Sequence, residues 1–245
     1  MIRPDWNVAP NVHAAFTLRT GGVSAAPFDT LNIAMHVGDS PDAVTENRRR
    51  VRDQLSLPAE PVWLEQVHGI DVLDLDATAA IGESNGLRAD AAITRSRGRV
   101  CAIQVADCMP VLFADAAGTA VGAAHAGWRG LAGGVLEATV SALGGRRADL
   151  TAWLGPAIGP GHFEVGDEVR AAFVSKDAAA ADAFVRNPRG RWQCDLNLLA
   201  VQRLATLGVT RIHGGSACTY ADRARFFSYR RDGRCGRMAA LLWLS

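Results

Sequence analysis

The fold is decided by one almost continuous apolar run, Val100-Cys101-Ala102-Ile103-Gln104-Val105-Ala106, then Asp107-Cys108, then Met109-Pro110-Val111-Leu112-Phe113. Such a run predicts strands that are buried on both faces. Asp107 and Cys108 interrupt it. Polar residues at the centre of an apolar run require a structural or chemical reason.

The segments on either side of this run predict alternating strands and helices. Residues 119–125 predict a strand of small residues, residues 126–130 a glycine-rich turn, and residues 131–143 a helix that ends at Gly144-Gly145. Upstream, residues 61–67 predict a strand, which places His68 at a strand end.

The rest of the chain continues the same mixture. Further strands are predicted at 12–18, 150–154, 209–213, 226–229 and 238–244, and further helices at 40–55, 165–173, 178–183 and 195–207. No internal repeat or linker divides the sequence. We therefore predict one layered α/β (α+β) domain over residues 1–245, with a mixed β-sheet flanked by helices.

Composition excludes several classes of protein. Of the 245 residues 49% are hydrophobic and 21% charged, which is enough apolar material for a large core. The formal net charge of +1 leaves no bulk excess to hold nucleic acid. Because no apolar run reaches the roughly 20 residues of a membrane span and the N-terminus lacks a secretory signal, we expect a cytoplasmic protein with no membrane partner.

Five widely spaced cysteines, an odd number, do not predict a disulfide framework. Four of them lie in apolar or turn contexts and are predicted to be buried structural thiols: Cys101, Cys194, Cys218 and Cys235. His162 and His213 are interpreted as hydrogen-bonded polar groups, and His36 as a residue at the border of a pocket. The segment 229–233 is interpreted as a solvated hairpin tip.

Three residues are candidates for a metal site. His68, Cys108 and His125 each lie at a strand end or at a break beside a turn. Imidazole and thiolate both suit zinc, and three protein ligands leave a fourth position open for water or substrate. The alternative is that each is an ordinary hydrogen-bonded histidine or buried thiol, since their spacing matches no compact zinc motif.

Several strings of the sequence resemble the laccase-domain family, also called the multicopper polyphenol oxidase family. They run from Leu64 to Gly69, Ala106 to Val111, Ala124 to Gly130 and Leu154 to Gly159, together with 17–24, Asn47-Arg48 and 226–232. The resemblance covers essentially the whole chain, in order. It implies a single α/β domain and a zinc site made by His68, Cys108 and His125.

The resemblance also implies a function. Despite the family's name, its members are described as purine nucleoside phosphorylases that act on adenosine, inosine, guanosine and methylthioadenosine, with adenosine deamination as a second activity. Some bacterial members are described as peptidoglycan editing factors. The partners that the resemblance implies are therefore a purine nucleoside and phosphate.

The residues can be tested against these chemistries. Six isolated histidines are too few for a multicopper oxidase, although one copper ion in place of zinc stays open. Zinc with an open position suits deamination, and Asp107 is the nearest candidate for the acid and base; the alternative is that Asp107 makes an orienting hydrogen bond within its own turn. Arg19, Arg48 and Arg129 stand beside glycine-rich turns and are the candidates for binding phosphate.

Two competing interpretations remain at this point. Cys108 with His125 as its base could form the nucleophile of a hydrolase or amidase that acts on peptidoglycan precursors. Alternatively, the zinc could be structural and the domain a binding module. The sequence does not specify the oligomeric state.

Overall fold

The computed structural model describes residues 1–77 and 87–245. A six-stranded sheet contains, in spatial order, β12 (Arg211–Gly214), β8 (Leu150–Leu154), β6 (Met109–Asp115), β7 (Val121–Ala126), β4 (Ala91–Thr94) and β3 (Val72–Asp74). A four-stranded sheet contains β1 (Val12–Phe16), β13 (Met238–Leu244), β5 (Val100–Val105) and β2 (Val62–Trp63). A small antiparallel sheet contains β10 (Phe184–Arg186), β11 (Trp192–Cys194) and β9 (Glu164–Val165).

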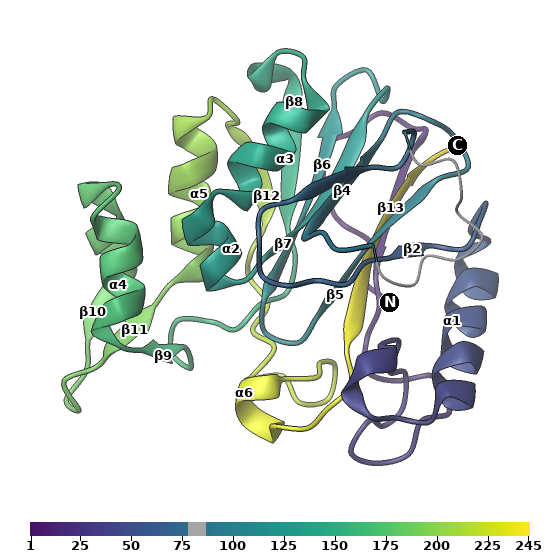
Figure 1. Ribbon diagram of the computed structural model, residues 1–245, viewed down its shortest axis with the longest axis horizontal. Helices are drawn as coiled ribbons and strands as arrows, with labels where there is room; N and C mark the ends of the chain where they lie inside the picture. Colours follow the sequence, from purple (N-terminus) through teal and green to yellow (C-terminus); the bar gives the residue numbers. More distant parts are fainter. Residues whose placement is uncertain (78–86) are drawn as a thin grey trace.

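The helices lie outside the two large sheets (Figure 1). They are α1 (Pro41–Leu55), α2 (Trp128–Gly133), α3 (Val135–Leu143), α4 (Asp167–Val174), α5 (Leu196–Thr206) and α6 (Tyr229–Asp232). Short 3-10 turns are η1 (Met35–Val37), η2 (Arg147–Asp149) and η3 (Ala178–Ala183). Both large sheets combine parallel and antiparallel pairs, which confirms the predicted mixed α+β class.

The apolar run of the sequence forms two adjacent strands that belong to different sheets. In β5, Cys101 and Ile103 point into the core between the two sheets, whereas Val100 and Ala102 point to the core beneath α1. In β6, Leu112 faces the core between the sheets, and its neighbours on the strand face the helices α3 and α5. Because both faces of each strand are covered, the strands read as continuous hydrophobic sequence.

The chain therefore stacks in four layers, with α1 on one side, then the four-stranded sheet, then the six-stranded sheet, then α2, α3 and α5 (Figure 1). The sequence predicted one mixed sheet, whereas the described residues form three sheets. The split is at Asp107-Cys108, where the chain leaves β5 in one sheet and enters β6 in the other.

Several predicted boundaries are wrong for local reasons. Residues 226–229 do not form a strand: the Ser228 hydroxyl accepts a hydrogen bond from the backbone N–H of Arg231 and caps the short helix α6, so the segment 229–233 is not a hairpin tip either. The helix predicted at 131–143 is broken by Gly134, whose φ of 114° only glycine adopts easily, and its first part already begins at Trp128.

The strand predicted at 61–67 is restricted to Val62 and Trp63, so His68 lies in a loop rather than at a strand end. The alanine-rich segment 178–183 forms a 3-10 helix. No helix within the described residues is both long and apolar enough to cross a membrane.

Candidate metal centre

The three candidate ligands meet where the chain crosses between the two large sheets. His68 lies in the loop that leads from β2 in the four-stranded sheet to β3 in the six-stranded sheet, and Cys108 in the connection from β5 to β6. His125 lies near the end of β7. Residues far apart in the sequence are therefore brought to one point by the sheet topology.

The geometry of the three side chains fits a metal ion. One donor atom from each residue lies within 4.8 Å of the others, and Cys108 Sγ is 3.8 Å from His68 Nε2. Metal bonds of about 2.0 to 2.3 Å in a tetrahedron separate ligand atoms by about 3.3 to 3.6 Å. Small side-chain movements are therefore enough to close the site around an ion, and the donor set suits zinc or copper.

Asp90, a buried aspartate just before β4, holds two of the ligands. One of its carboxylate oxygens lies 2.8 Å from His125 Nδ1, and the carboxylate accepts the backbone N–H groups of Val67, His68 and Gly69 at 3.1, 2.9 and 2.6 Å. A proton on Nδ1 of His125 leaves Nε2 free as a ligand. The same bonds stabilise the loop in which His68 has a φ of 62°.

The electrostatics of the site favour a thiolate. Burial raises the pKa of the Cys108 thiol, but the charge of His125 and hydrogen bonds from both histidines outweigh burial and lower this pKa to about 6. Burial lowers the pKa of His125, whereas the Cys108 thiolate and Asp90 raise it, with a net result of about 9. Burial raises the pKa of the Asp90 carboxyl group. The hydrogen bonds from His125 and from the loop N–H groups outweigh burial, so the net pKa is lowered. Thiolate is the form of cysteine that binds metal.

A glycine is required beside the site because of space. A Cβ atom on Gly127 would lie 2.9 Å from Cys108 Sγ and 3.0 Å from His68 Cδ2. Gly127 is the residue before α2, at the end of β7. Any side chain there would occupy the space in which the ligands converge.

The ligands form part of the wall of a cavity of about 560 Å³, which Arg129 and Arg237 also line. A smaller and mostly apolar cavity of about 130 Å³ shares Cys108 and Tyr229 with it. Its remaining lining includes Trp128, Phe163, Ile158, Leu196 and Arg230. The site thus combines a cationic region with an adjoining aromatic one.

Only one of the three predicted phosphate-binding arginines lies at this cavity. Arg129 does, with its guanidinium over the Trp128 ring. Arg19 bonds to Asp29 and lines a separate cavity. Arg48 is half-buried against the Trp63 ring and donates to the carbonyl of Ile33. Arg237, which no sequence argument singled out, lies at the cavity instead.

Asp107, the predicted acid and base, is engaged in holding the backbone. Its carboxylate accepts hydrogen bonds from the hydroxyls of Thr219 and Ser228, at 2.6 and 3.0 Å, and from the backbone N–H of Arg230 at 2.7 Å. These partners lie more than 100 positions away in the sequence, so the orienting bonds are not within its own turn. This geometry favours a positioning role over proton transfer.

The remaining cysteine and histidine predictions have mixed outcomes. Cys101, Cys194 and Cys235 are buried as predicted, whereas Cys218 is only half-buried, with its Sγ 3.6 Å from His162 Nδ1. His36 lines the metal-site cavity. His213 is half-buried in β12.

Sequence reasoning missed Asp90 and α6. A sequence signal existed for Asp90, since an acidic residue directly precedes the apolar segment Ala91–Thr94. Tyr229 and Arg230 were assigned to a solvent-exposed turn, because nothing in the local sequence indicates that α6 packs against the connection that carries Cys108.

Comparisons with known proteins agree with this architecture. A purine nucleoside phosphorylase of Pseudomonas aeruginosa is 54% identical over 99% of this chain and 98% of its own length, and the purine nucleoside phosphorylase YfiH of Escherichia coli is 51% identical over 100% and 98%. The crystal structure of protein NMB0706 of Neisseria meningitidis matches with a TM-score of 0.94 and 45% identity, over 100% of this chain and 98% of that one. The sequence profile of the family described as multi-copper polyphenol oxidoreductase laccase matches residues 13–245, and the chain belongs to that family.

Proposed function

We propose that the chain is a zinc-dependent purine nucleoside phosphorylase, with adenosine deamination as a second activity. The observation that carries this proposal is the convergence of His68, Cys108 and His125 in the wall of a cavity that also contains two arginines and adjoins an aromatic pocket. The names of the relatives at 54% and 51% identity support the same reaction.

The two cavities suit the two parts of the reaction. A purine is flat and largely apolar on its faces, and it fits the small cavity beside Trp128, Phe163 and Tyr229. Phosphate carries about two charges and suits the guanidinium groups of Arg129 and Arg237 in the larger cavity. The ribose then lies between them, beside Cys108, which lines both.

The residues of the site promote phosphorolysis by orienting the phosphate and by compensating its negative charge. A phosphate oxygen attacks C1′ of the ribose, the bond from C1′ to the purine nitrogen breaks, and the electron pair of that bond leaves with the base. Arg129 and Arg237 hold the phosphate in line with the bond from C1′ to the purine nitrogen, and they reduce the electrostatic repulsion between the phosphate and the Cys108 thiolate.

Zinc, when bound, supplies a Lewis acid and lowers the pKa of a coordinated water to about 7, which is the chemistry that attack on C6 of adenosine requires. Cys108 and both histidines serve as its ligands in this proposal. Asp90 keeps His125 in the tautomer that binds the ion. Asp107 holds α6 beside the cavity and is not assigned a proton transfer.

One observation favours a second candidate function, a cysteine-dependent hydrolase or amidase. The lowered pKa of Cys108 and its contacts with two histidines are also the features of an activated nucleophile. The two functions make opposite use of the same thiolate. Bound metal protects Cys108 from alkylation, whereas a free nucleophile reacts quickly at neutral pH.

Metal reconstitution tests the proposal. The purified protein is stripped with a chelator and reloaded with zinc or with copper, and phosphate-dependent release of hypoxanthine from inosine is measured. Zinc is expected to restore the release, and Arg129→Gln to raise the KM for phosphate more than it lowers kcat. Phosphorolysis that persists in the stripped protein would show that the metal is not required, and phenol oxidation that appears only with copper would favour a single-copper oxidase.

A further inference from the structure

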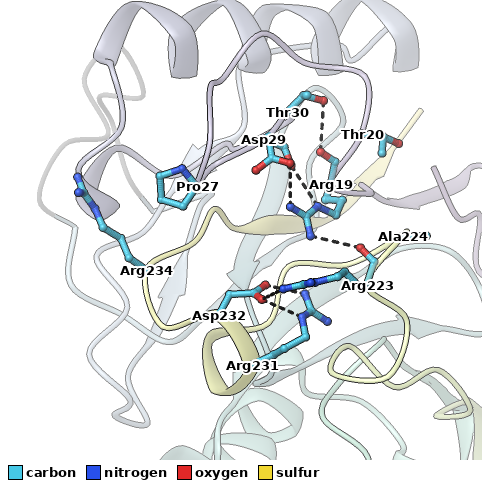
Figure 2. Close-up of a pocket in the computed structure, with 10 residues that line it drawn as sticks. All are labelled: Arg19, Thr20, Pro27, Asp29, Thr30, Arg223, Ala224, Arg231, Asp232 and Arg234. Carbon is cyan, nitrogen blue, oxygen red and sulfur yellow. Dashed lines mark hydrogen bonds and ion pairs between the residues drawn. The ribbon is translucent and has the colours of Figure 1, made fainter.

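A third cavity, of about 770 Å³, also borders α6 (Figure 2). Tyr229 and Arg230 of that helix line the cavities at the metal centre, whereas Arg231 and Asp232 line this one. Two of the strings on which the family resemblance rests, residues 17–24 and 226–232, meet here. The proposed phosphorylase reaction makes no use of this cavity.

The cavity is cationic. Its lining contains four arginines (Arg19, Arg223, Arg231 and Arg234) and two aspartates (Asp29 and Asp232), so two positive charges are in excess. The formal net charge of the whole chain is only +1, so this excess does not reflect a basic chain overall. The excess is local and concentrated in one concave region.

Two of the arginines are neutralised and act as part of the frame. Arg231 pairs with Asp232 through Nε and Nη2, at 3.0 and 2.7 Å, and its other nitrogen donates to the carbonyls of Thr219 and Tyr220. Arg19 pairs with Asp29 at 3.1 Å, and its guanidinium also donates to the backbone carbonyl of Arg223. Both arginine side chains are largely buried.

The other two arginines supply the excess. The side chain of Arg223 is 72% exposed and shares Asp232, which Arg231 already neutralises. Arg234 packs over the Phe28 ring and donates to the carbonyl of Gly38, and among the described residues no carboxylate pairs with its guanidinium. Each uses few of its five N–H groups within the part of the chain described, which leaves donors for a ligand.

The walls are fixed before any ligand arrives. The backbone N–H of Arg19 donates to the carbonyl of Arg225 at 2.9 Å, and the N–H groups of Thr30 and Leu31 donate to the carbonyl of Arg19 at 2.7 and 2.8 Å. These bonds join the two loops that bound the cavity. A rigid frame reduces the entropy that is lost when a ligand binds.

We propose that this cavity binds a small molecule through a phosphate group. The excess of two positive charges matches the charge of one phosphate, and the planar N–H pair of a guanidinium matches its oxygen atoms. Arg223 lies beside Arg19 and Arg231 and offers such a pair, whereas Arg234 lies on the other side of the cavity and contributes charge (Figure 2). Asp29 and Asp232 in the lining oppose a longer polyanion such as nucleic acid. The inference goes beyond the proposed catalytic function, since the site is separate from the metal ligands.

The experiment is a calorimetric titration at low ionic strength with two probes, inorganic phosphate and ribose 5-phosphate. It is carried out on the full chain as Arg129→Gln, which weakens phosphate binding at the metal centre. Two double variants are made in this background. One carries Arg223→Gln and Arg234→Gln. The other, a control that loses the same charge, carries Arg146→Gln and Arg211→Gln. Arg146 and Arg211 are exposed and lie outside the cavity.

At least one probe is expected to bind the Arg129→Gln protein and its charge-matched control, and affinity is expected to fall about tenfold or more when Arg223 and Arg234 are replaced. Tighter binding of ribose 5-phosphate would identify a phosphate monoester as the ligand class, and tighter binding of phosphate the free ion. If neither probe binds, or if the charge-matched control loses affinity equally, the proposal is overturned. Phosphorolysis by the Arg223→Gln, Arg234→Gln protein with Arg129 intact is expected to be unchanged, so failure of this site is distinguishable from failure of the enzyme assignment.

Discussion

At the residue scale, Asp90 links His125 to the loop that carries His68. In Asp90→Asn an amide replaces the carboxylate. This weakens the hydrogen bond to His125 Nδ1 and the hydrogen bonds that the carboxylate accepts from three N–H groups of the loop. We expect zinc affinity to fall about 10- to 100-fold. A competition titration against a zinc chelator measures it, with Asp182→Asn, at an exposed position, as the matched control. An unchanged affinity would contradict the role given to Asp90.

A second prediction at this scale concerns the Gly127→Ala substitution. In Gly127→Ala the new Cβ would meet Cys108 Sγ at 2.9 Å, and the sulfur and the His68 ring would have to move apart. We expect zinc content and activity to fall together while the far-ultraviolet circular dichroism stays native. Gly161→Ala adds a methyl group to open space and is the control. Full zinc occupancy in Gly127→Ala would contradict the conclusion that a side chain at position 127 displaces Cys108 and His68.

The pKa of Cys108 gives a pH dependence. Because the charge and hydrogen bonds of the histidines hold this pKa at about 6, the metal-free protein is expected to be alkylated at Cys108 at a rate that rises through pH 6 and is constant above about pH 7. The assay uses a Cys218→Ser background, because Cys218 is also half-exposed. Zinc is expected to suppress the reaction at pH 7 and above, where the Cys108 thiol is deprotonated. Rapid alkylation of the zinc-loaded protein would favour the nucleophile over the ligand.

At the scale of elements, Asp107 fixes the position of α6. Removal of its carboxylate charge in Asp107→Asn weakens the bonds to Thr219, Ser228 and the Arg230 N–H. We expect KM for the nucleoside to rise, since Tyr229 and Arg230 line the cavity that we propose for the purine, while the pH profile of kcat keeps its shape. A profile that loses one limb would instead identify Asp107 as the acid or base.

The element boundaries show what sequence can and cannot predict. Helix α1 was predicted to within one residue, because Ser40-Pro41 caps it and Val44, Val51 and Leu55 repeat at helical spacing. Residues 226–229 were mistaken for a strand because two phenylalanines suggest one. The bonds that shape this segment come from Asp107 and from the cap at Ser228, and the bond from Asp107 is invisible to local sequence.

At the scale of the whole molecule, the class of fold followed from composition and the apolar run, whereas the division into sheets did not. Cys101 and Val111 both read as buried strand, and nothing in the run shows that β5 and β6 belong to different sheets. The convergence of His68, Cys108 and His125 was inferred from their residue types and from the family resemblance. Their spacing alone, with gaps of tens of residues, could not have established it.

The packing of the layers also predicts the effect of metal removal. Three large core clusters extend through the described part of the chain, and Cys108 packs partly buried against one of them. Because these clusters account for most of the core, chelation is expected to abolish activity without unfolding. Thermal melting followed by circular dichroism measures this, with a lower Tm but a native spectrum at 25 °C expected after chelation. Unfolding at 25 °C would favour a structural zinc and a binding module.

The central claim is tested most directly by analysis of the products of adenosine. Zinc-loaded protein is incubated with adenosine, with and without phosphate, alongside Cys108→Ala. We predict ribose 1-phosphate in an amount equal to adenine plus hypoxanthine, formed only with phosphate and only by the unmodified chain, together with some inosine that does not depend on phosphate. If the zinc-loaded chain forms neither pair of products, or if Cys108→Ala forms them at the same rate, the account of this site is contradicted.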